Sequence, residues 1–158
     1  MFKYKIEKVI STHSFISHQI SVITLSDQKG NIFTGIAVSP IPISLFSEAT
    51  YSEAMGDYGK PLIIDARQAM LLCAFIENVL NGILPSKILV RSNGPALRII
   101  LKKYMKNWHD GGAYKGSVTF GGLGGFGFFS NSTVTKHSLV ELKNSLIKAF
   151  NLESKKTN

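Results

Sequence analysis

The order of apolar patterns along the chain predicts a single α/β domain built on a mixed sheet. Apolar and polar residues alternate with a period of two near the N-terminus, which is typical of half-buried strands. Apolar stripes at helical spacing appear in the middle and at the end of the chain. The 158 residues are 44% hydrophobic and 18% charged, so the chain can bury a core of its own. We expect one domain over residues 1–152, followed by a frayed polar tail over 153–158.

Three antiparallel strands are expected to open the domain. The alternation that begins at Phe2 predicts a first strand as far as Ser11. Residues 18–26 and 31–38 predict two more strands, which the turn sequence Asp27-Gln28-Lys29-Gly30 joins into a hairpin. Gly35, inside the third strand, indicates a bulge or a close approach of another backbone.

The best-specified helix is expected to begin at Asp65. Asp65 and Gln68 stand at capping-box spacing, and the helix should run to about Leu80, with Gly82 just past its end. Before it, residues 44–60 are the least clearly patterned stretch, in which Ser44 is expected to cap a short helix that runs through Met55.

The second half is predicted to hold a strand, a helix, a hairpin and a last helix. The apolar residues within 87–91 predict a central parallel strand. The predicted order is therefore three antiparallel strands, then a helix, this strand and another helix. The corner over 92–95 then starts a helix over 96–108. A glycine-rich hairpin follows between 117 and 130, and a Ser138–Glu141 capping box starts the C-terminal helix.

Basic residues gather on the predicted helix over 96–108. No Asp or Glu occurs from Asn78 to His109, and the net charge of the chain is +8. Arg98, Lys102 and Lys106 are four residues apart, which places them on one face of a helix. The candidate nucleic-acid-binding residues are Arg91, Arg98, Lys102, Lys106 and Lys115.

One stretch combines a strand, a turn and a helix entry. It reads Leu89-Val90-Arg91-Ser92-Asn93-Gly94-Pro95-Ala96-Leu97 and leads to Asn107-Trp108. It resembles the ribonuclease H segment in which a central strand ends in Asp-Ser, enters a helix and reaches an Asn-Trp pair. The resemblance covers roughly residues 15–110 and implies a ribonuclease H-like arrangement of the sheet.

The carboxylates of that family have no counterparts in this chain. The family's activity needs several carboxylates that hold two divalent metal ions. The corresponding positions are Thr24 or Ser26, Gln68 or Ala69, and Ser92 or Asn93, together with Glu141, which helix capping explains. The resemblance therefore implies a relative without nuclease activity.

No other catalytic or metal-binding pattern stands out. The four histidines have no ligand spacing to one another or to Cys73, which lies in an apolar helical run. We therefore expect no metal and no cofactor, and Cys73 as a packing thiol. One cysteine, a charged N-terminus and the absence of a long apolar run indicate a cytoplasmic protein that does not engage a membrane.

Three functions fit these features. The first is a non-catalytic domain that binds an anionic partner, most plausibly nucleic acid, through the basic residues. The second is a protein-interaction module, such as an adaptor, inhibitor or immunity factor, which uses the glycine-rich hairpin or the basic residues against an acidic protein. Separately, an apolar hairpin over 117–130 would allow two copies of the chain to pair edge to edge as a homodimer. The third is a small-ligand-binding domain or enzyme with a pocket at Ser92, Asn93 and Gly94. The first requires that the basic residues are not neutralised by Glu48, Glu53 or Asp57.

Overall fold

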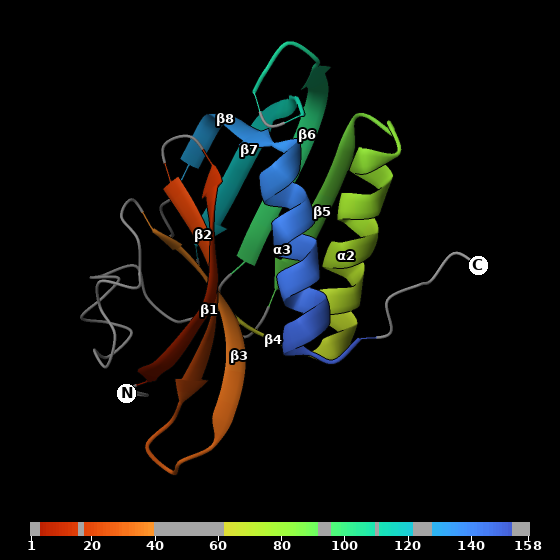
Figure 1. The fold of residues 1–158 in the computed structure, drawn as a ribbon. Coiled ribbons are helices and arrows are strands. Elements are labelled where there is room, and N and C mark those ends of the chain that lie inside the picture. The colour runs from red at the N-terminus through yellow and green to blue at the C-terminus, as the bar shows by residue number, and fades with distance from the viewer. Residues whose placement is uncertain are drawn as a thin grey trace.

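In the part of the chain that the structure describes, an antiparallel sheet carries two helices on one of its faces (Figure 1). The computed structural model describes residues 4–15, 18–39, 62–91, 96–109, 111–121 and 128–152. Its elements are β1 (Lys5–Phe15), β2 (His18–Ser26), β3 (Ile32–Ser39), β4 (Leu62–Ile64), α2 (Ala66–Leu80), β5 (Ser86–Arg91), β6 (Ala96–Met105), β7 (Ala113–Gly121), β8 (Phe128–Thr135) and α3 (Lys136–Ala149). The predicted combination of helices and strands is therefore correct, whereas the predicted mixed sheet is wrong, because all the described strand pairs are antiparallel.

The sheet consists of two four-stranded halves. The strand order is β4-β3-β2-β1-β8-β7-β6-β5, and every neighbouring pair is antiparallel. One residue pair, Phe15 with Val134, joins β1 to β8, so the two halves meet along a short seam. Within the described residues each half is a run of four strands followed by a helix. The helices α2 and α3 lie side by side in Figure 1.

The strands β2 and β3 follow the predicted boundaries closely, whereas β1 extends four residues beyond its predicted end at Ser11, to Phe15. The Asp27 carboxylate accepts hydrogen bonds from the backbone N–H groups of Lys29 and Asn31, each at 2.9 Å, and Gly30 has φ of +83°. These contacts close the hairpin between β2 and β3. The close backbone approach predicted at Gly35 is confirmed, because a Cβ there would lie 2.9 Å from the carbonyl oxygen of Leu62 on β4.

Both ends of α2 are as predicted. The Asp65 side chain accepts from the N–H of Gln68 at 2.9 Å, and the Gln68 amide oxygen accepts from the N–H of Asp65 at 3.0 Å. At the other end Gly82 has φ of +84°, and the N–H of Ile83 donates to the carbonyl of Asn78 at 2.9 Å. The predicted helix at the start of the 44–60 segment lies outside the described residues.

The predicted N-terminus of α3 is wrong by three residues. Thr135 caps the helix, and its hydroxyl oxygen accepts from the N–H of Ser138 at 3.1 Å. Glu141 instead lies one turn inside the helix, 3.8 Å from the His137 ring. The reason is that β8 runs directly into α3, so the last strand residue is also the cap. The predicted apolar stripe is correct at Leu139, Leu142 and Leu146, all buried.

The predicted basic helix over 96–108 is wrong, since this segment contains the strand β6. Leu97, Ile99 and Leu101 are buried at every second position, and β6 pairs with both β5 and β7. The central parallel strand predicted over 87–91 is also wrong: β5 lies at the edge of the sheet and is antiparallel to β6.

These two corrections remove the basis of the ribonuclease H-like arrangement. That arrangement needs a parallel central strand that enters a helix, whereas here an edge strand is followed by an antiparallel strand. The glycine-rich hairpin does exist as β7 and β8, with its turn over 122–127 outside the described residues. Because β7 and β8 are interior strands, their hairpin does not offer the free edge that the predicted self-pairing over 117–130 requires.

Apolar side chains cover the two faces of the sheet differently. The main core lies between the sheet and the helices and includes side chains from both halves, such as Val22, Leu101 and Leu142. A second cluster, formed by Ile6, Ile23, Leu25 and Ala37, lies on the far face of the N-terminal half.

A β-bulge interrupts the pairing of β6 with β7. Leu101 pairs with Gly116 and Lys103 pairs with Lys115, so Lys102 is one extra residue on β6. Gly116 stands against this bulge, where an added Cβ would lie 1.8 Å from the carbonyl oxygen of Ile100. The backbones therefore approach too closely for any side chain at position 116.

We predict that Gly116→Ala lowers the free energy of unfolding by about 3 kcal/mol, because the new methyl group must displace a backbone carbonyl in the sheet. The neighbouring Ser117→Ala is the matched control and should change it by less than about 0.5 kcal/mol. Urea unfolding measures both. Equal stabilities of the two variants would show that the close approach at the bulge does not constrain the fold.

Candidate functional site

Basic side chains occupy the face of β5, β6 and β7 that is turned away from the helices. Along β5, Ile88 packs against the main core and Val90 is buried in it, so the side chains between and beside them point to the opposite face. On β6, Arg98 lies between the buried residues Leu97 and Ile99 and is exposed. We call this surface the basic face and define it by Lys87, Arg91, Arg98, Lys103 and Lys115, all exposed.

The β6 bulge is what brings Lys103 onto the basic face. Lys103 pairs directly with Lys115, whose neighbours Tyr114 and Gly116 are buried on the helix side. Directly opposed residues point to the same face of a sheet, so both lysines project away from the helices. In a regular strand of the same sequence without the bulge, Lys102 would face away from the helices and Lys103 would face the core.

The cations of the basic face have no acidic partner among the described residues. The ion pairs among the described residues lie on the helices instead. They join Lys143 to Glu77 at 3.3 Å and His137 to Glu141 at 3.8 Å. Glu48, Glu53 and Asp57, which the sequence suggested as internal counter-charges, lie outside the described residues. Within the described residues, therefore, the basic face is an unneutralised positive surface.

Apolar side chains lie between the cations. Leu89 sits on β5 between Lys87 and Arg91 and is 44% exposed. It stands directly opposite Arg98, while Lys87 stands opposite the half-buried Ile100. The basic face thus alternates charged and aliphatic groups on an open part of the sheet.

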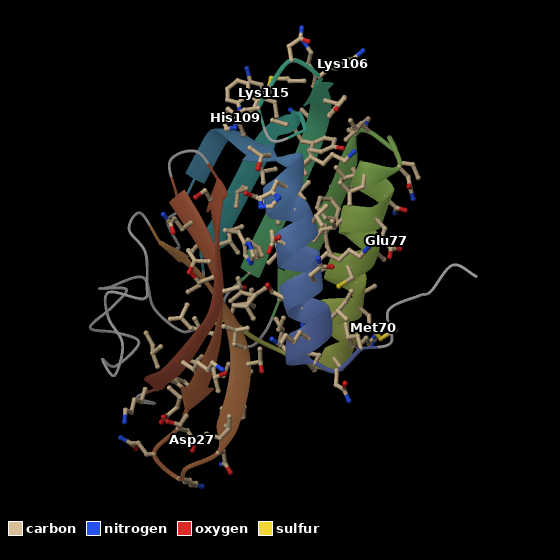
Figure 2. The ribbon with its side chains drawn as sticks, in the orientation of Figure 1. Asp27, Met70, Glu77, Lys106, His109 and Lys115 are labelled. Atoms are coloured by element: carbon tan, nitrogen blue, oxygen red, sulfur yellow. The ribbon has the colours of Figure 1, made fainter. Side chains whose placement is uncertain are left out.

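The structure brings together three of the five predicted binding residues. Arg91, Arg98 and Lys115 belong to the basic face, although on strands rather than on a helix. Lys102 is exposed at the bulge, and Lys106 follows β6 at the end of the molecule where Figure 2 also shows Lys115. Arg98, Lys102 and Lys106 therefore do not share one face of a helix, as their spacing of four residues had predicted.

Two members of the basic face were missed by the predicted binding set. Lys87 is followed by three consecutive apolar residues, so the sequence of β5 does not show which face Lys87 occupies. Lys103 could not be found from period two alone, because the bulge shifts its face. Residues 92–94, the predicted small-ligand pocket, lie outside the described residues, and the parallel strand end on which that pocket depended is not present at β5.

Two other classes of reactive group occur among the described residues, namely possible metal ligands and the single cysteine. Within the described ranges, no group of three or more His, Cys, Asp or Glu side chains could hold a metal ion. Cys73 is buried, and burial raises the pKa of its thiol to about 11, which leaves it protonated at neutral pH. No helix among the described residues is long and apolar enough to span a membrane. No protein-family model matches the sequence, and no curated protein aligns with it significantly.

His13 is a buried titratable side chain on the strand that packs against α3. It lies on β1, and its Nε2 atom is 2.8 Å from the hydroxyl oxygen of Ser11. Burial lowers the pKa of the imidazole below 6.5, and the carboxylate of Glu141 on α3 offsets this only in part. The neutral ring is thus the form that the fold prefers.

We predict that stability decreases in acid because of His13. Below pH 6.5 the unfolded chain protonates this residue while the folded chain does not, so the free energy of unfolding falls with pH until the lowered pKa is reached. Urea unfolding at about pH 7.5 and about pH 5.5 should show a smaller loss for His13→Gln than for the wild type. The exposed His137→Gln is the control and should lose as much as the wild type. An unchanged loss in His13→Gln would contradict this assignment.

Proposed function

We propose that the chain is a non-catalytic domain that binds nucleic acid through the basic face. The observation that carries the proposal is the pair Lys103–Lys115, two lysines placed directly opposite each other on adjacent strands. Like charges in this position destabilise a sheet, and no described acid neutralises them. An anionic ligand would remove that repulsion.

The distribution of charge favours a polyanion over a single phosphate. Lys87 and Arg91 are four residues apart on β5, a separation of about 13 Å, and β7 lies two strands away from β5, at about 10 Å. Such distances suit a ligand with repeated charges better than one compact anion. The cations do not converge on one point, as they would around a small metabolite.

The shape of the basic face favours an unpaired strand over a duplex. Duplex DNA is commonly read by a helix or a narrow ribbon that enters a groove, whereas the basic face is a part of a broad sheet with Leu89 and Ile100 between its cations. Unpaired bases can rest on such apolar groups while the phosphates meet the lysines and arginines. Localisation in the cytoplasm would be compatible with this function and remains our expectation.

An acidic protein surface is the competing partner, since it would use the same charges. The two partners differ in how affinity depends on salt, because a nucleic acid releases condensed counterions in proportion to the phosphates neutralised. Capture of one protein from nuclease-treated extract, with no binding to oligonucleotides at low salt, would favour the protein-interaction function.

We predict that Lys103→Gln has opposite effects on binding and on stability. It should weaken binding to a fluorescent single-stranded oligonucleotide and reduce the log–log salt slope by about 0.7, the value for one phosphate contact. It should also raise the free energy of unfolding by a few tenths of a kcal/mol, because the repulsion from Lys115 is lost.

The matched control for this variant is Lys148→Gln, an exposed lysine on α3 and so on the helix side of the sheet. It should leave the affinity and the salt slope unchanged. A loss of binding in Lys148→Gln equal to that in Lys103→Gln would reject the basic face as the site. Absence of binding by the wild type at low salt would reject the function.

We also predict that Leu89→Ala weakens binding without changing the salt slope, because Leu89 contributes apolar contact rather than charge. Loss of about 1 kcal/mol of contact energy corresponds to roughly a fivefold weaker affinity. Ile32→Ala is the control, an exposed apolar residue at the start of β3. Fluorescence anisotropy at several salt concentrations measures both. A changed slope in Leu89→Ala would mean that the substitution acts through the cations instead.

A further inference from the structure

The one tryptophan of the chain lies outside the apolar core. Trp108 belongs to the connection between β6 and β7, is partly exposed, and is part of neither apolar cluster formed by the described residues. Its ring centroid is 5.7 Å from that of His109, with 36° between the ring planes. Core packing therefore does not explain the position of this large side chain, and a partly exposed tryptophan is typical of a contact with a partner.

Glycines and a tyrosine fix the conformation of this connection. Gly111 and Gly112 have φ of +81° and +102°, which other residues rarely adopt. The Tyr104 hydroxyl donates to the carbonyl of Gly111 at 3.0 Å, and a Cβ at Gly112 would lie 2.5 Å from the oxygen of this hydroxyl. The N–H of Gly112 donates to the carbonyl of Trp108 at 3.1 Å. The backbone of Trp108 is thus held against the start of β7.

Lysines lie on both sides of the connection. Lys115 is the third residue of β7, about 7 Å along the strand from its first residue, and Lys103 stands directly opposite it on β6. Lys106 is exposed at the start of the connection. Figure 2 shows Lys106, His109 and Lys115 gathered at one end of the molecule. A strand whose phosphates lie on these lysines therefore passes close to Trp108.

We propose that Trp108 binds a nucleobase by stacking and forms a base-binding position at this end of the basic face. The inference rests on the proposed function, because the cations must hold the phosphates of the same strand. Leu89 and Ile100 give that strand aliphatic contacts, whereas the indole ring gives it a flat aromatic surface. Every base has a face that can stack on such a ring, so the ligand class is an unpaired strand of any sequence.

Tryptophan fluorescence tests this inference in the unmodified chain, since one tryptophan means that the emission reports on position 108 alone. The two probes are a single-stranded oligothymidylate and an abasic oligonucleotide of equal length, which carries the same phosphates without bases. We expect the oligothymidylate to quench the emission of Trp108. The abasic oligonucleotide should bind through the same cations and leave the emission nearly unchanged.

Substitutions then separate base contact from phosphate contact. Trp108→Leu should weaken binding of labelled oligothymidylate at least about fivefold, because a stacking surface is lost. It should leave the affinity for the abasic oligonucleotide and the salt slope unchanged, because no phosphate contact is lost. Trp108→Phe, which keeps an aromatic ring, should recover part of the affinity. Phe33→Leu is the matched control, since Phe33 is a partly exposed aromatic residue on β3 that contacts Tyr4 at 6.2 Å. It should bind both probes as the wild type does.

Two outcomes would overturn the inference and leave the proposed function standing. The first is salt-dependent binding of oligothymidylate that does not change the emission of Trp108, a result that is decisive even if Trp108→Leu does not fold. The second is equal weakening of both probes by Trp108→Leu, which would indicate a general effect on the fold. Binding of neither probe by the wild type at low salt would reject the proposed function and this inference together.

Discussion

The β-bulge at Lys102 is the constraint on which the functional surface depends. On the N-terminal side of it, Leu97, Ile99 and Leu101 face the helices, and Arg98 faces away. On the other side the extra residue turns Lys103 outward, so that both ends of β6 contribute a cation to the same face. The bulge also brings the two backbones so close that only glycine fits at position 116. Core packing and surface charge are therefore set by the same local irregularity.

The two halves of the sheet resemble each other in order but differ on their far faces. In the described residues each half contains four strands and one helix, and the two helices share one core. The far face of the N-terminal half holds a buried apolar cluster that includes Ile23 and Leu25. The corresponding face of β5, β6 and β7 carries exposed cations and Leu89 instead. The contrast is consistent with different roles for the two far faces. The apolar cluster of the N-terminal half adds stability, and the charged face of the C-terminal half is the surface that we propose for binding.

Local signals in the sequence predicted the local structure well. The Asp27 turn, the capping box at Asp65 and the close approach at Gly35 each depend on residues that are neighbours or on one backbone requirement. Strand direction was not predictable in the same way, because pairing partners are distant in sequence. An apolar run such as that in β5 is compatible with two positions in a sheet. It can form a central parallel strand, or an edge strand with a helix over one face, and the sequence does not distinguish between them.

The sequence of β6 lacks the strict alternation of polar and apolar residues that marks a strand. Leu97, Ile99 and Leu101 face the helices, but the half-buried Ile100 faces away with Arg98, so four of the five residues from 97 to 101 are apolar. Arg98, Lys102 and Lys106 also stand at helical spacing, so the charge pattern matched a helix. The prediction of a basic surface was still useful, because the positive charge of this segment does not depend on its backbone conformation.

Lysine acetylation footprinting with and without a short single-stranded oligonucleotide tests the central claim most directly. The basic face contains Lys87, Lys103 and Lys115, whereas Lys136 and Lys148 lie on α3 and Lys29 in the β2–β3 turn. If nucleic acid binds the basic face, the first three lysines are protected from acetylation and the other three remain fully reactive. Protection of the α3 lysines, or equal reactivity of all six, would contradict the assignment of this surface.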